Sequence, residues 1–375
     1  MNRLKLSEIC NINAGGTPAR SKKEYWNHGK IPWCKISDFS GKYIEKVEEN
    51  ITEEGLNNSS AKLFKKGTIL YTIFATIGEV AILNIESTTN QAIAGIEIKN
   101  NGVELEYLYY FLKSLKYIML NKSRGVAQNN INLSILRNTE IYIPDKTIQK
   151  AIAEKLDNVE KIIYKKNEQL KELNNLIKSQ FVEMFGDPIQ NDKKWDTDLI
   201  NNVAPSQNYK GSFEDKVWLL NLDMVESNSG RIIGYVYENI NNIGNSTCTF
   251  NEENILYSKL RPYLNKVVIP SQKGYATSEL VPLKPNKDKL NRYFLAYLLR
   301  SEQFVQYISE KVAGAKMPRV SMDMFRKFNL ILPPIELQNK FAEFVKQIDK
   351  QKFEIENSLK EMQKLYECLM EKYFG

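Results

Sequence analysis

The sequence predicts an α+β protein: two tandem, pseudo-repeated mixed α/β domains joined by two long helices that form an antiparallel coiled coil. Two observations lead to this prediction. The 375-residue chain repeats a series of short motifs once, at a spacing of about 185–189 residues. Each half also ends in a stretch without glycine or proline, in which apolar residues recur every seven positions. The predicted segments are a first domain at 1–145, a first helix at 146–189, a second domain at 190–333 and a second helix at 334–375.

The repeat is recognised by the shared order of weak matches. Residues 33–38 (WCKISD) align with 218–223 (WLLNLD), and Ile69-Leu70-Tyr71 recurs as Ile255-Leu256-Tyr257. Further along, IYIP at 141–144 matches LILP at 330–333. No single match is specific, but the same order through the whole chain indicates a duplicated domain.

Each domain has the same internal plan. Short β-like runs punctuated by Gly, Asn and Pro come first, such as residues 67–83 and 265–270. An amphipathic helical stretch follows at 104–120 in the first half and at 291–308 in the second. A last strand precedes the long helix. This order predicts a mixed α/β domain in each half.

The two long helices are predicted from residues 148–185 and 335–374. Pro144 and Pro333-Pro334 suit helix starts, and Gly186 and Gly375 suit helix ends. Because the first helix leads into the second domain and the second ends the chain, the compact pairing is antiparallel. The alternative is a long surface helix on each domain, which would have little surface on which to bury so long an apolar stripe. The predicted coiled-coil core is Ile152, Leu156, Val159, Ile163, Leu170, Leu173 and Ile177 with Phe341, Val345, Ile348, Ile355, Leu359, Met362 and Leu369.

The composition excludes several classes of protein. No apolar run approaches the roughly 18–20 residues of a membrane span, and the N-terminus lacks an apolar signal-peptide core, so we expect a cytoplasmic protein with no membrane partner. The four cysteines show no CxxC spacing, and His28 is the single histidine. These counts argue against a zinc site and against histidine-dependent catalysis, and no phosphate-binding loop motif is present.

The sequence resembles the specificity subunit of type I restriction-modification systems. The first half carries GGTP at 15–18, IPWCKISDF at 31–39, GTILYTIFATIGEVAIL at 67–83 with Asn90-Gln91, and GVAQNNINL at 125–133. The second half carries ILYSKLRPYLNKVVIP at 255–270, ATSEL at 276–280 and LILPPIELQNKF at 330–341. The second half lacks a GGTP counterpart and departs most near its start.

The resemblance implies a non-catalytic subunit of a larger complex. Each domain would be a target-recognition domain that reads half of a split, asymmetric site in double-stranded DNA, and the coiled coil would set the unread spacer. The helices would also dock two methyltransferase (M) subunits, and restriction-translocase (R) subunits would join this core. S-adenosylmethionine, ATP and Mg would bind to those partners, which methylate adenine N6, and no cofactor or metal is expected on this chain.

Charge favours DNA contacts on the two domains. Residues 1–145 carry 18 Lys and Arg against 15 Asp and Glu, and residues 190–333 carry 19 against 15, whereas the helices are near neutral. Cations contact phosphates or guanine, and Asn and Gln pair with adenine. The predicted DNA-binding residues are Arg20, Lys22, Lys23, Lys35, Arg124, Gln128, Asn129 and Asn130 in the first domain and Lys210, Lys259, Arg261, Lys316 and Arg319 in the second.

Two other functions are open at this point. One is a coiled-coil adaptor whose two domains bind proteins without reading DNA sequence. The other is a self-sufficient enzyme, against which the missing motifs argue. Steeply salt-dependent affinity for duplex DNA would separate the first of these from a DNA-binding subunit.

Overall fold

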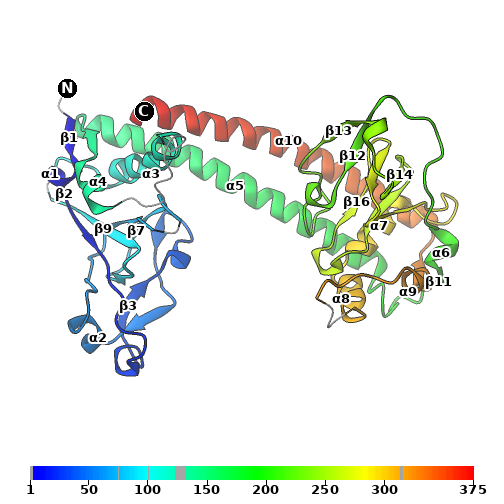
Figure 1. Ribbon diagram of the computed structural model, residues 1–375, viewed down its shortest axis with the longest axis horizontal. Coiled ribbons are helices and arrows are strands. Elements are labelled where there is room, and N and C mark those ends of the chain that lie inside the picture. Colours follow the sequence, from blue (N-terminus) through cyan, green and yellow to red (C-terminus); the bar gives the residue numbers. More distant parts are fainter. Residues whose placement is uncertain (1–2, 75, 100, 123–131, 313–315) are drawn as a thin grey trace. The chain divides into compact units, whose positions relative to one another are not determined.

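The computed structural model describes residues 3–74, 76–99, 101–122, 132–312 and 316–375. For residues 117–122 it describes the backbone only. The chain forms two compact units (Figure 1). Unit 1 comprises Met1–Lys166 and Ser358–Gly375, and unit 2 comprises Asn167–Asn357. Each unit therefore contains one globular domain and about half of each long helix.

Unit 1 is built on a five-stranded sheet and a three-stranded sheet. The five-stranded order is β2 (Cys10–Ala14), β9 (Ile93–Ile98), β6 (Ile69–Thr72), β7 (Val80–Leu83), β4 (Tyr43–Ile44). The three-stranded order is β5 (Glu49–Ile51), β3 (Ile31–Cys34), β8 (Thr88–Thr89), and β1 (Arg3–Lys5) pairs separately with β10 (Glu140–Tyr142). The helix α3 (Leu105–Lys122) packs on β6 and β7, whose side chains are all buried.

Unit 2 has a four-stranded sheet and a three-stranded sheet. The first has the order β13 (Val236–Asn239), β12 (Lys216–Leu220), β17 (Gly274–Thr277), β14 (Thr247–Phe250). The second has the order β16 (Val267–Val268), β15 (Ile255–Ser258), β18 (Leu280–Leu283), and β11 (Asp196–Leu199) pairs with β19 (Asn329–Leu332). The helix α7 (Arg292–Arg300) packs on β15 and β16.

Strand pairing confirms the duplication that the sequence predicts. The strand β3, which carries Trp33, is antiparallel to β5 and parallel to β8, and β12, which carries Trp218, is antiparallel to β13 and parallel to β17. Likewise β6 is antiparallel to β7 and β9, and β15 is antiparallel to β16 and β18. The copies differ in the size of this second sheet. In unit 2 it has three strands with β15 in the middle, whereas in unit 1 the strands β2 and β4 extend it to five.

Short helices connect these strands. The α-helices are α1 (Leu6–Ile9), α2 (Glu53–Asn57), α4 (Leu133–Asn138), α6 (Ile200–Val203), α8 (Glu302–Glu310) and α9 (Met322–Arg326). The 3₁₀ turns are η1 (Lys23–Tyr25), η2 (Ile36–Asp38), η3 (Leu222–Met224), η4 (Ile240–Asn242) and η5 (Pro262–Leu264). The stretch 291–308, predicted as one helix, is two helices, because Ser301 adopts an extended conformation and its hydroxyl accepts the Phe304 N–H to cap α8.

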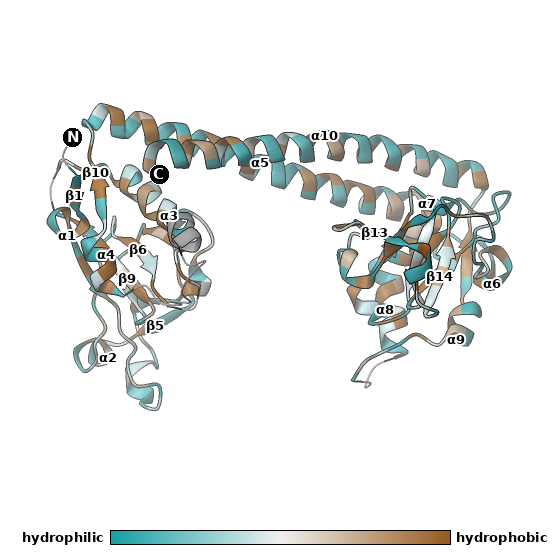
Figure 2. Cartoon of the chain, turned by 45° about the horizontal axis from the view of Figure 1, so that its top comes forward, coloured by the Kyte–Doolittle hydropathy of each residue, from teal (hydrophilic) through white to brown (hydrophobic). Residues whose placement is uncertain are grey.

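The two long helices are α5 (Lys146–Phe185) and α10 (Ile335–Phe374). The first starts just after Pro144, and the second starts directly after Pro334, as their proline signals predict. The first ends at Gly186, whose φ of +74° suits glycine and whose N–H donates to the Val182 carbonyl. Figure 2 shows apolar turns alternating with polar ones along both helices.

Within each unit, opposite ends of the two helices share one core. In unit 1, Ile152, Leu156 and Val159 of α5 are buried in the same cluster as Tyr366 and Met370 from the end of α10. In unit 2, the last turns of α5 join the first turns of α10, and Phe181 and Phe341 have ring centroids 5.5 Å apart. The helices are therefore antiparallel.

The residues predicted for the coiled-coil core are buried or half-buried. Besides those of unit 1 named above, Ile177, Phe341, Val345 and Ile348 are buried, and the half-buried set is Ile163, Leu170, Leu173, Ile355, Leu359, Met362 and Leu369. The heptad rows omit Phe181, Phe185 and Met370, which are also buried. An α-helix has 3.6 residues per turn, so the buried face drifts away from a strict seven-residue row toward each helix end, where it packs on the domain.

Polar contacts hold α5 to the body of unit 1. Lys42 Nζ lies 2.6 Å from Asp157 Oδ1, and Lys113 Nζ lies 2.5 Å from Glu160 Oε1. The Tyr110 hydroxyl donates to the same two carboxylates, at 2.5 Å to Asp157 and 3.0 Å to Glu160. Burial raises the pKa of Tyr110, so the phenol keeps the proton that it donates. An aromatic contact at the helix ends is repeated in both units: the ring centroid of Phe185 lies 4.7 Å from that of Phe294 in unit 2, and that of Phe374 lies 5.3 Å from that of Tyr107 in unit 1.

A fully buried glutamine joins α5 to the strand-helix connection of unit 1. The Gln149 side-chain oxygen accepts the Glu104 N–H at 2.9 Å, just before α3. Its amide nitrogen donates to the carbonyls of Gly102 at 2.9 Å and Pro144 at 2.7 Å. One side chain thus satisfies three backbone groups at the start of α3 and α5.

The second copy repeats this arrangement. Gln338, also fully buried, accepts the Asn291 N–H at 2.9 Å and donates to the carbonyls of Lys289 at 3.0 Å and Pro333 at 2.7 Å. We refer to Gln149 and Gln338 as the helix-anchoring glutamines. Their duplication indicates that the angle at which each long helix leaves its domain is held by the same contact.

We predict that Gln338→Ala destabilises the protein. The substitution removes a fully buried side chain that bonds one N–H and two carbonyls, and we expect the free energy of unfolding to fall by about 3 kcal/mol. Denaturant unfolding followed by circular dichroism measures this loss. Gln351→Ala, at an exposed position of the same helix, is the control and should change stability by less than about 0.5 kcal/mol. Equal effects of the two substitutions would contradict the anchoring role.

Candidate nucleic-acid interface

The GGTP turn of unit 1 is held against the sheet by its backbone. The N–H groups of Gly15 and Gly16 donate to the carbonyls of Ile93 at 3.0 Å and Thr89 at 2.8 Å. A side chain at Gly16 would collide with the backbone of Ser60, so this close approach requires glycine. The turn thereby positions the loop that follows it, which carries Arg20.

The indole groups of two tryptophans also form hydrogen bonds to the turn and the loop. The indole N–H of Trp33 on β3 donates to the Gly16 carbonyl at 3.0 Å, and that of Trp26 donates to the Ala19 carbonyl at 3.2 Å. The rings of Trp26 and Trp33 meet edge to face with centroids 5.0 Å apart. Trp33 is 3% exposed and belongs to the core, whereas Trp26 is half-buried.

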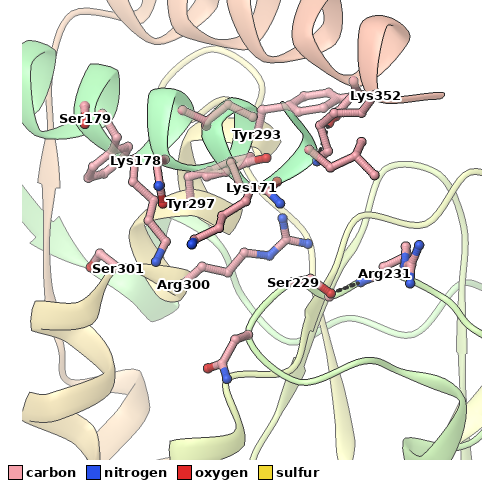
Figure 3. A pocket seen from close by; sticks show the side chains of 18 of the residues that line it. Lys171, Lys178, Ser179, Ser229, Arg231, Tyr293, Tyr297, Arg300, Ser301 and Lys352 are labelled. Atoms are coloured by element: carbon pink, nitrogen blue, oxygen red, sulfur yellow. Dashed lines mark hydrogen bonds and ion pairs between the residues drawn. The ribbon is translucent and has the colours of Figure 1, made fainter. Parts of the chain in front are cut away.

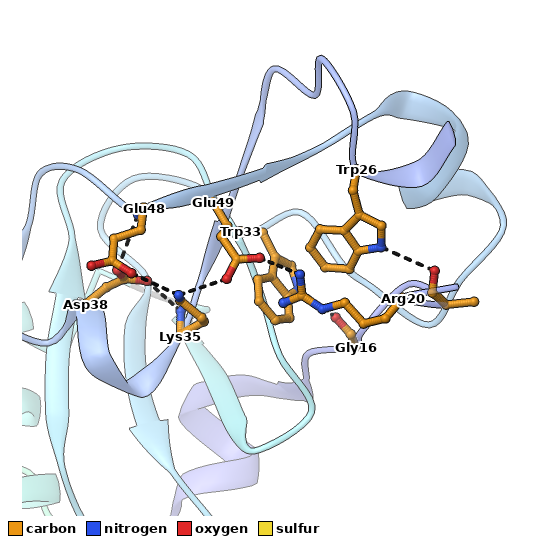
Figure 4. A network of polar contacts seen from close by, with 9 residues as sticks. Gly16, Arg20, Trp26, Trp33, Lys35, Asp38, Glu48 and Glu49 are labelled. Carbon is orange, nitrogen blue, oxygen red and sulfur yellow. Dashed lines mark hydrogen bonds and ion pairs between the residues drawn. The ribbon is translucent and has the colours of Figure 1, made fainter. Parts of the chain in front are cut away.

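Arg20 lies against both rings and pairs with Glu49 (Figure 4). Its guanidinium carbon is 3.6 Å from the ring centroid of Trp26 and 4.6 Å from that of Trp33. Its Nη1 donates to Glu49 Oε2 at 2.5 Å. The strand register explains this meeting: Glu49 on β5 lies directly opposite Trp33 on β3, and directly opposed residues project from the same face of a sheet.

Lys35 shares the same carboxylate. Its Nζ lies 2.8 Å from Glu49 Oε1 and 2.9 Å from Glu48 Oε2. The bond from Arg20, and then that from Lys35, lowers the pKa of Glu49 below its usual range, while Glu49 and Glu48 raise the pKa of Lys35. The structure thus brings two predicted DNA-binding cations together on one acidic partner.

The remaining described candidates of the first domain, Lys22 and Lys23, are separate from this network. Lys22 donates to the Tyr25 hydroxyl at 2.9 Å, a bond that raises the pKa of Lys22. Lys23 is exposed, and its side chain has no hydrogen bond or ion pair to the described residues. The other predicted contacts of this domain, Arg124, Gln128, Asn129 and Asn130, lie outside the described residues.

In unit 2, backbone pairing gathers three of the predicted residues. The Arg261 N–H donates to the Pro318 carbonyl and the Val320 N–H to the Lys259 carbonyl, both at 2.8 Å, so residues 259–261 lie beside 318–320. Arg319 donates from Nη2 to Glu279 Oε1 at 2.6 Å. The side chains of Lys259 and Arg261 have no hydrogen bond or ion pair to the described part of the chain.

Arg261 has a left-handed backbone conformation, with φ of +50°, at the start of η5. This conformation is uncommon for a residue with a side chain. The guanidinium is exposed, as is the ammonium group of Lys316 at the edge of the described loop. Lys210, also exposed, follows Tyr209, whose N–H donates to the Thr249 carbonyl on β14.

Sequence reasoning missed the anionic partners of these cations. Glu49 and Glu279 lie 29 and 40 residues from Arg20 and Arg319, and only strand pairing brings them together. Trp26, which covers one face of Arg20, was also missed. Its position within the loop after GGTP is the one signal that the sequence offered.

A groove of about 1220 Å³ opens elsewhere in unit 2, between α5, α7, α10 and the loop 226–231 (Figure 3). Arg231 pairs in it with Glu226 at 3.0 Å and Glu356 at 3.2 Å, and Lys178 pairs with Glu302 at 3.1 Å. The predicted DNA-binding residues do not line it. Because its cations are mostly satisfied by nearby carboxylates, we place the candidate interface on the two cationic clusters instead.

Two further properties concern the described residues only. No three His, Cys, Asp or Glu side chains among them gather in a way that could hold a metal ion. No helix in the described ranges is long and apolar enough to span a membrane.

Comparison with known proteins identifies the class of this protein. The family model of the type I restriction modification DNA specificity domain matches residues 1–175 and 223–363. The chain belongs to this family, and it carries the domain twice.

Individual relatives agree with this assignment. The type I restriction enzyme MjaIX specificity subunit of Methanocaldococcus jannaschii is 26% identical over 98% of this chain and 91% of its own. The S subunit of the type I restriction-modification system of M. genitalium has the same fold, with a TM-score of 0.57 at 14% identity over 100% of this chain and 96% of that one. A chain from a structure of type I R-M complex assembly and conformational transition gives a TM-score of 0.61 at 15% identity, covering 100% of this chain and 97% of that one.

We predict that Arg20 controls the ionisation of Glu49 more strongly than Lys35 does. Arg20→Ala should raise the pKa of Glu49 toward its usual value, and Lys35→Ala should raise it by less, because the Arg20 bond is the larger cause of the lowering. NMR titration of the labelled side-chain carboxyl carbon measures both. Lys66→Ala, at an exposed position of the same unit, should leave the titration unchanged. A larger shift for Lys35→Ala would contradict this order.

Proposed function

We propose that this chain is the sequence-recognition subunit of a type I restriction-modification complex and binds a bipartite, asymmetric site in double-stranded DNA. Each globular domain reads one half-site, and the long helices set the unread spacer between the half-sites. The helices also dock methyltransferase subunits, two per chain, and restriction subunits join that complex.

The observation that carries this proposal is one fold repeated with two different cationic clusters. Strand pairing is the same in β3 and β12 and in β6 and β15, so the two domains are alike as scaffolds. The clusters differ: unit 1 has Arg20 and Lys35 on Glu49, and unit 2 has Lys259, Arg261 and Arg319 beside Glu279. A common scaffold with different contact residues is what two different half-sites require.

The chemistry is proposed to lie on the partners. Methyl transfer from S-adenosylmethionine to adenine N6, and ATP- and Mg-dependent translocation and cleavage, would take place on the M and R subunits. This chain would contribute binding and register only. Two copies of the domain suit this binding role, because each half-site then lies beside one methyltransferase subunit.

The test is methylation mapping. The chain is co-expressed with the methyltransferase subunit of its own system, and N6-methyladenine is located in the host DNA by sequencing. We expect a single split motif with one modified adenine on each strand. An intact complex that methylates no defined motif would contradict the proposal and favour the protein-binding adaptor, as would an affinity for duplex DNA that does not fall with salt.

A second prediction concerns the spacer. Removing one heptad from each long helix, centred on Lys166 in α5 and on Asn357 in α10, shortens each helix by about 10 Å. We expect the unread spacer to shorten by about 3 base pairs, at roughly 3.4 Å per base pair, with both half-sites unchanged. The same mapping measures this.

The control for that deletion replaces the same heptads by others of equal length that keep the apolar positions. The spacer should then stay as in the parent chain. An unchanged spacer after the deletion, in a complex that still methylates, would show that the helices do not set the distance.

A further inference from the structure

Among the described cations of the candidate interface, Arg20 has its orientation determined by the most contacts. Its loop is fixed at Gly16 and at Ala19 by indole N–H groups, and its guanidinium contacts two aromatic rings. One N–H is bonded to Glu49. None of the other described residues predicted to contact DNA combines aromatic rings with a carboxylate in this way.

These contacts leave a particular set of donors available. The ring of Trp26 lies over the guanidinium, and the ring of Trp33, perpendicular to it, lies beside it. The guanidinium N–H groups point outward in its plane, so further acceptors approach in that plane. A guanidinium has five N–H donors in a rigid fork. Glu49 takes one donor of Arg20, and the side chain is still 52% exposed, so neighbouring N–H groups remain available at the open edge.

A planar pair of donors matches a planar pair of acceptors. Guanine presents O6 and N7 side by side in the major groove, and a bidentate arginine is their commonest partner. Stacking and the carboxylate hold the fork in position before DNA arrives, which lowers the entropy lost on binding. Lys35 differs because its ammonium group cannot form the planar fork and both of its ion pairs use its donors.

We propose that Arg20 is a specificity-determining residue that reads a guanine in the half-site of the first domain, and that Trp26 and Glu49 are positioning residues for it. This inference rests on the proposed function and adds the base that one residue recognises. It also separates Arg20 from Lys23, an exposed cation that is suited to phosphate.

The experiment compares methylation motifs of the full chain and of Arg20→Lys, each co-expressed with the methyltransferase subunit. Lysine keeps the charge but loses the bidentate fork. We expect one guanine position in one half-site to relax, with discrimination falling roughly 5- to 150-fold, while the other half-site stays unchanged. Lys23→Gln is the matched comparison and should leave the motif as it is, whatever its effect on the extent of methylation.

The outcomes separate the inference from the proposed function. A parent chain without any motif would overturn the proposed function itself. A parent motif that Arg20→Lys leaves unchanged would overturn the reading of guanine alone, as would a first half-site with no guanine on either strand. If methylation weakens at all sites but the motif is unchanged, Arg20 contacts phosphate. If both half-sites lose selectivity, Arg20 supports the structure of the protein. Either result rejects the inference.

Glu49→Gln provides a second variant if Arg20→Lys does not assemble with its partner. It keeps Arg20 and the two rings but removes the negative charge that holds the fork. The same guanine position should relax by a smaller factor than with a full loss of arginine. If the complex is intact and that position keeps its full preference, Glu49 does not position Arg20 and the inference fails.

Discussion

The attachment of each long helix to its domain depends on one buried side chain. Gln149 and Gln338 each accept one backbone N–H and donate to two carbonyls at the point where a domain helix and a long helix begin. Both glutamine side chains are fully buried, so the geometry of the junction is restricted to the one that satisfies their hydrogen bonds. The direction in which each domain is held then follows from the direction of its helix.

The two units attach the ends of the long helices by the same aromatic contact. In unit 2, Phe185 at the end of α5 packs on Phe294 of α7, and in unit 1, Phe374 at the end of α10 packs on Tyr107 of α3. Ion pairs also hold α5 in unit 1, and such a half-buried network costs desolvation but requires a specific geometry. The duplicated fold has thus kept its topology, its helix-anchoring glutamines and this aromatic contact.

The described cations of the candidate interface fall into anchored and free groups. Arg20, Lys35 and Arg319 pair with carboxylates, whereas Lys23 and Arg261 have no such partner. A carboxylate beside a DNA-contacting cation reduces non-selective attraction to phosphate and restricts the directions in which the cation can bind. An anchored arginine, which keeps further donors in a fixed plane, therefore suits recognition of bases, and free cations suit the phosphate backbone.

The sequence by itself determined the duplication, the extent of the long helices and their antiparallel pairing. Heptad spacing, Pro144 and Gly186 are local signals, and connectivity left one compact pairing. It could not determine that the stretch 291–308 breaks at Ser301, or that the last turns of each helix drift from the heptad row onto the domain. Only the tertiary structure decided which cations are anchored, because Arg20 meets Glu49 through the register of β3 on β5, and Arg319 meets Glu279 through pairing of distant segments. Charge counts along the chain contain no information about such register, since the partner of a cation is set by hydrogen bonds between strands.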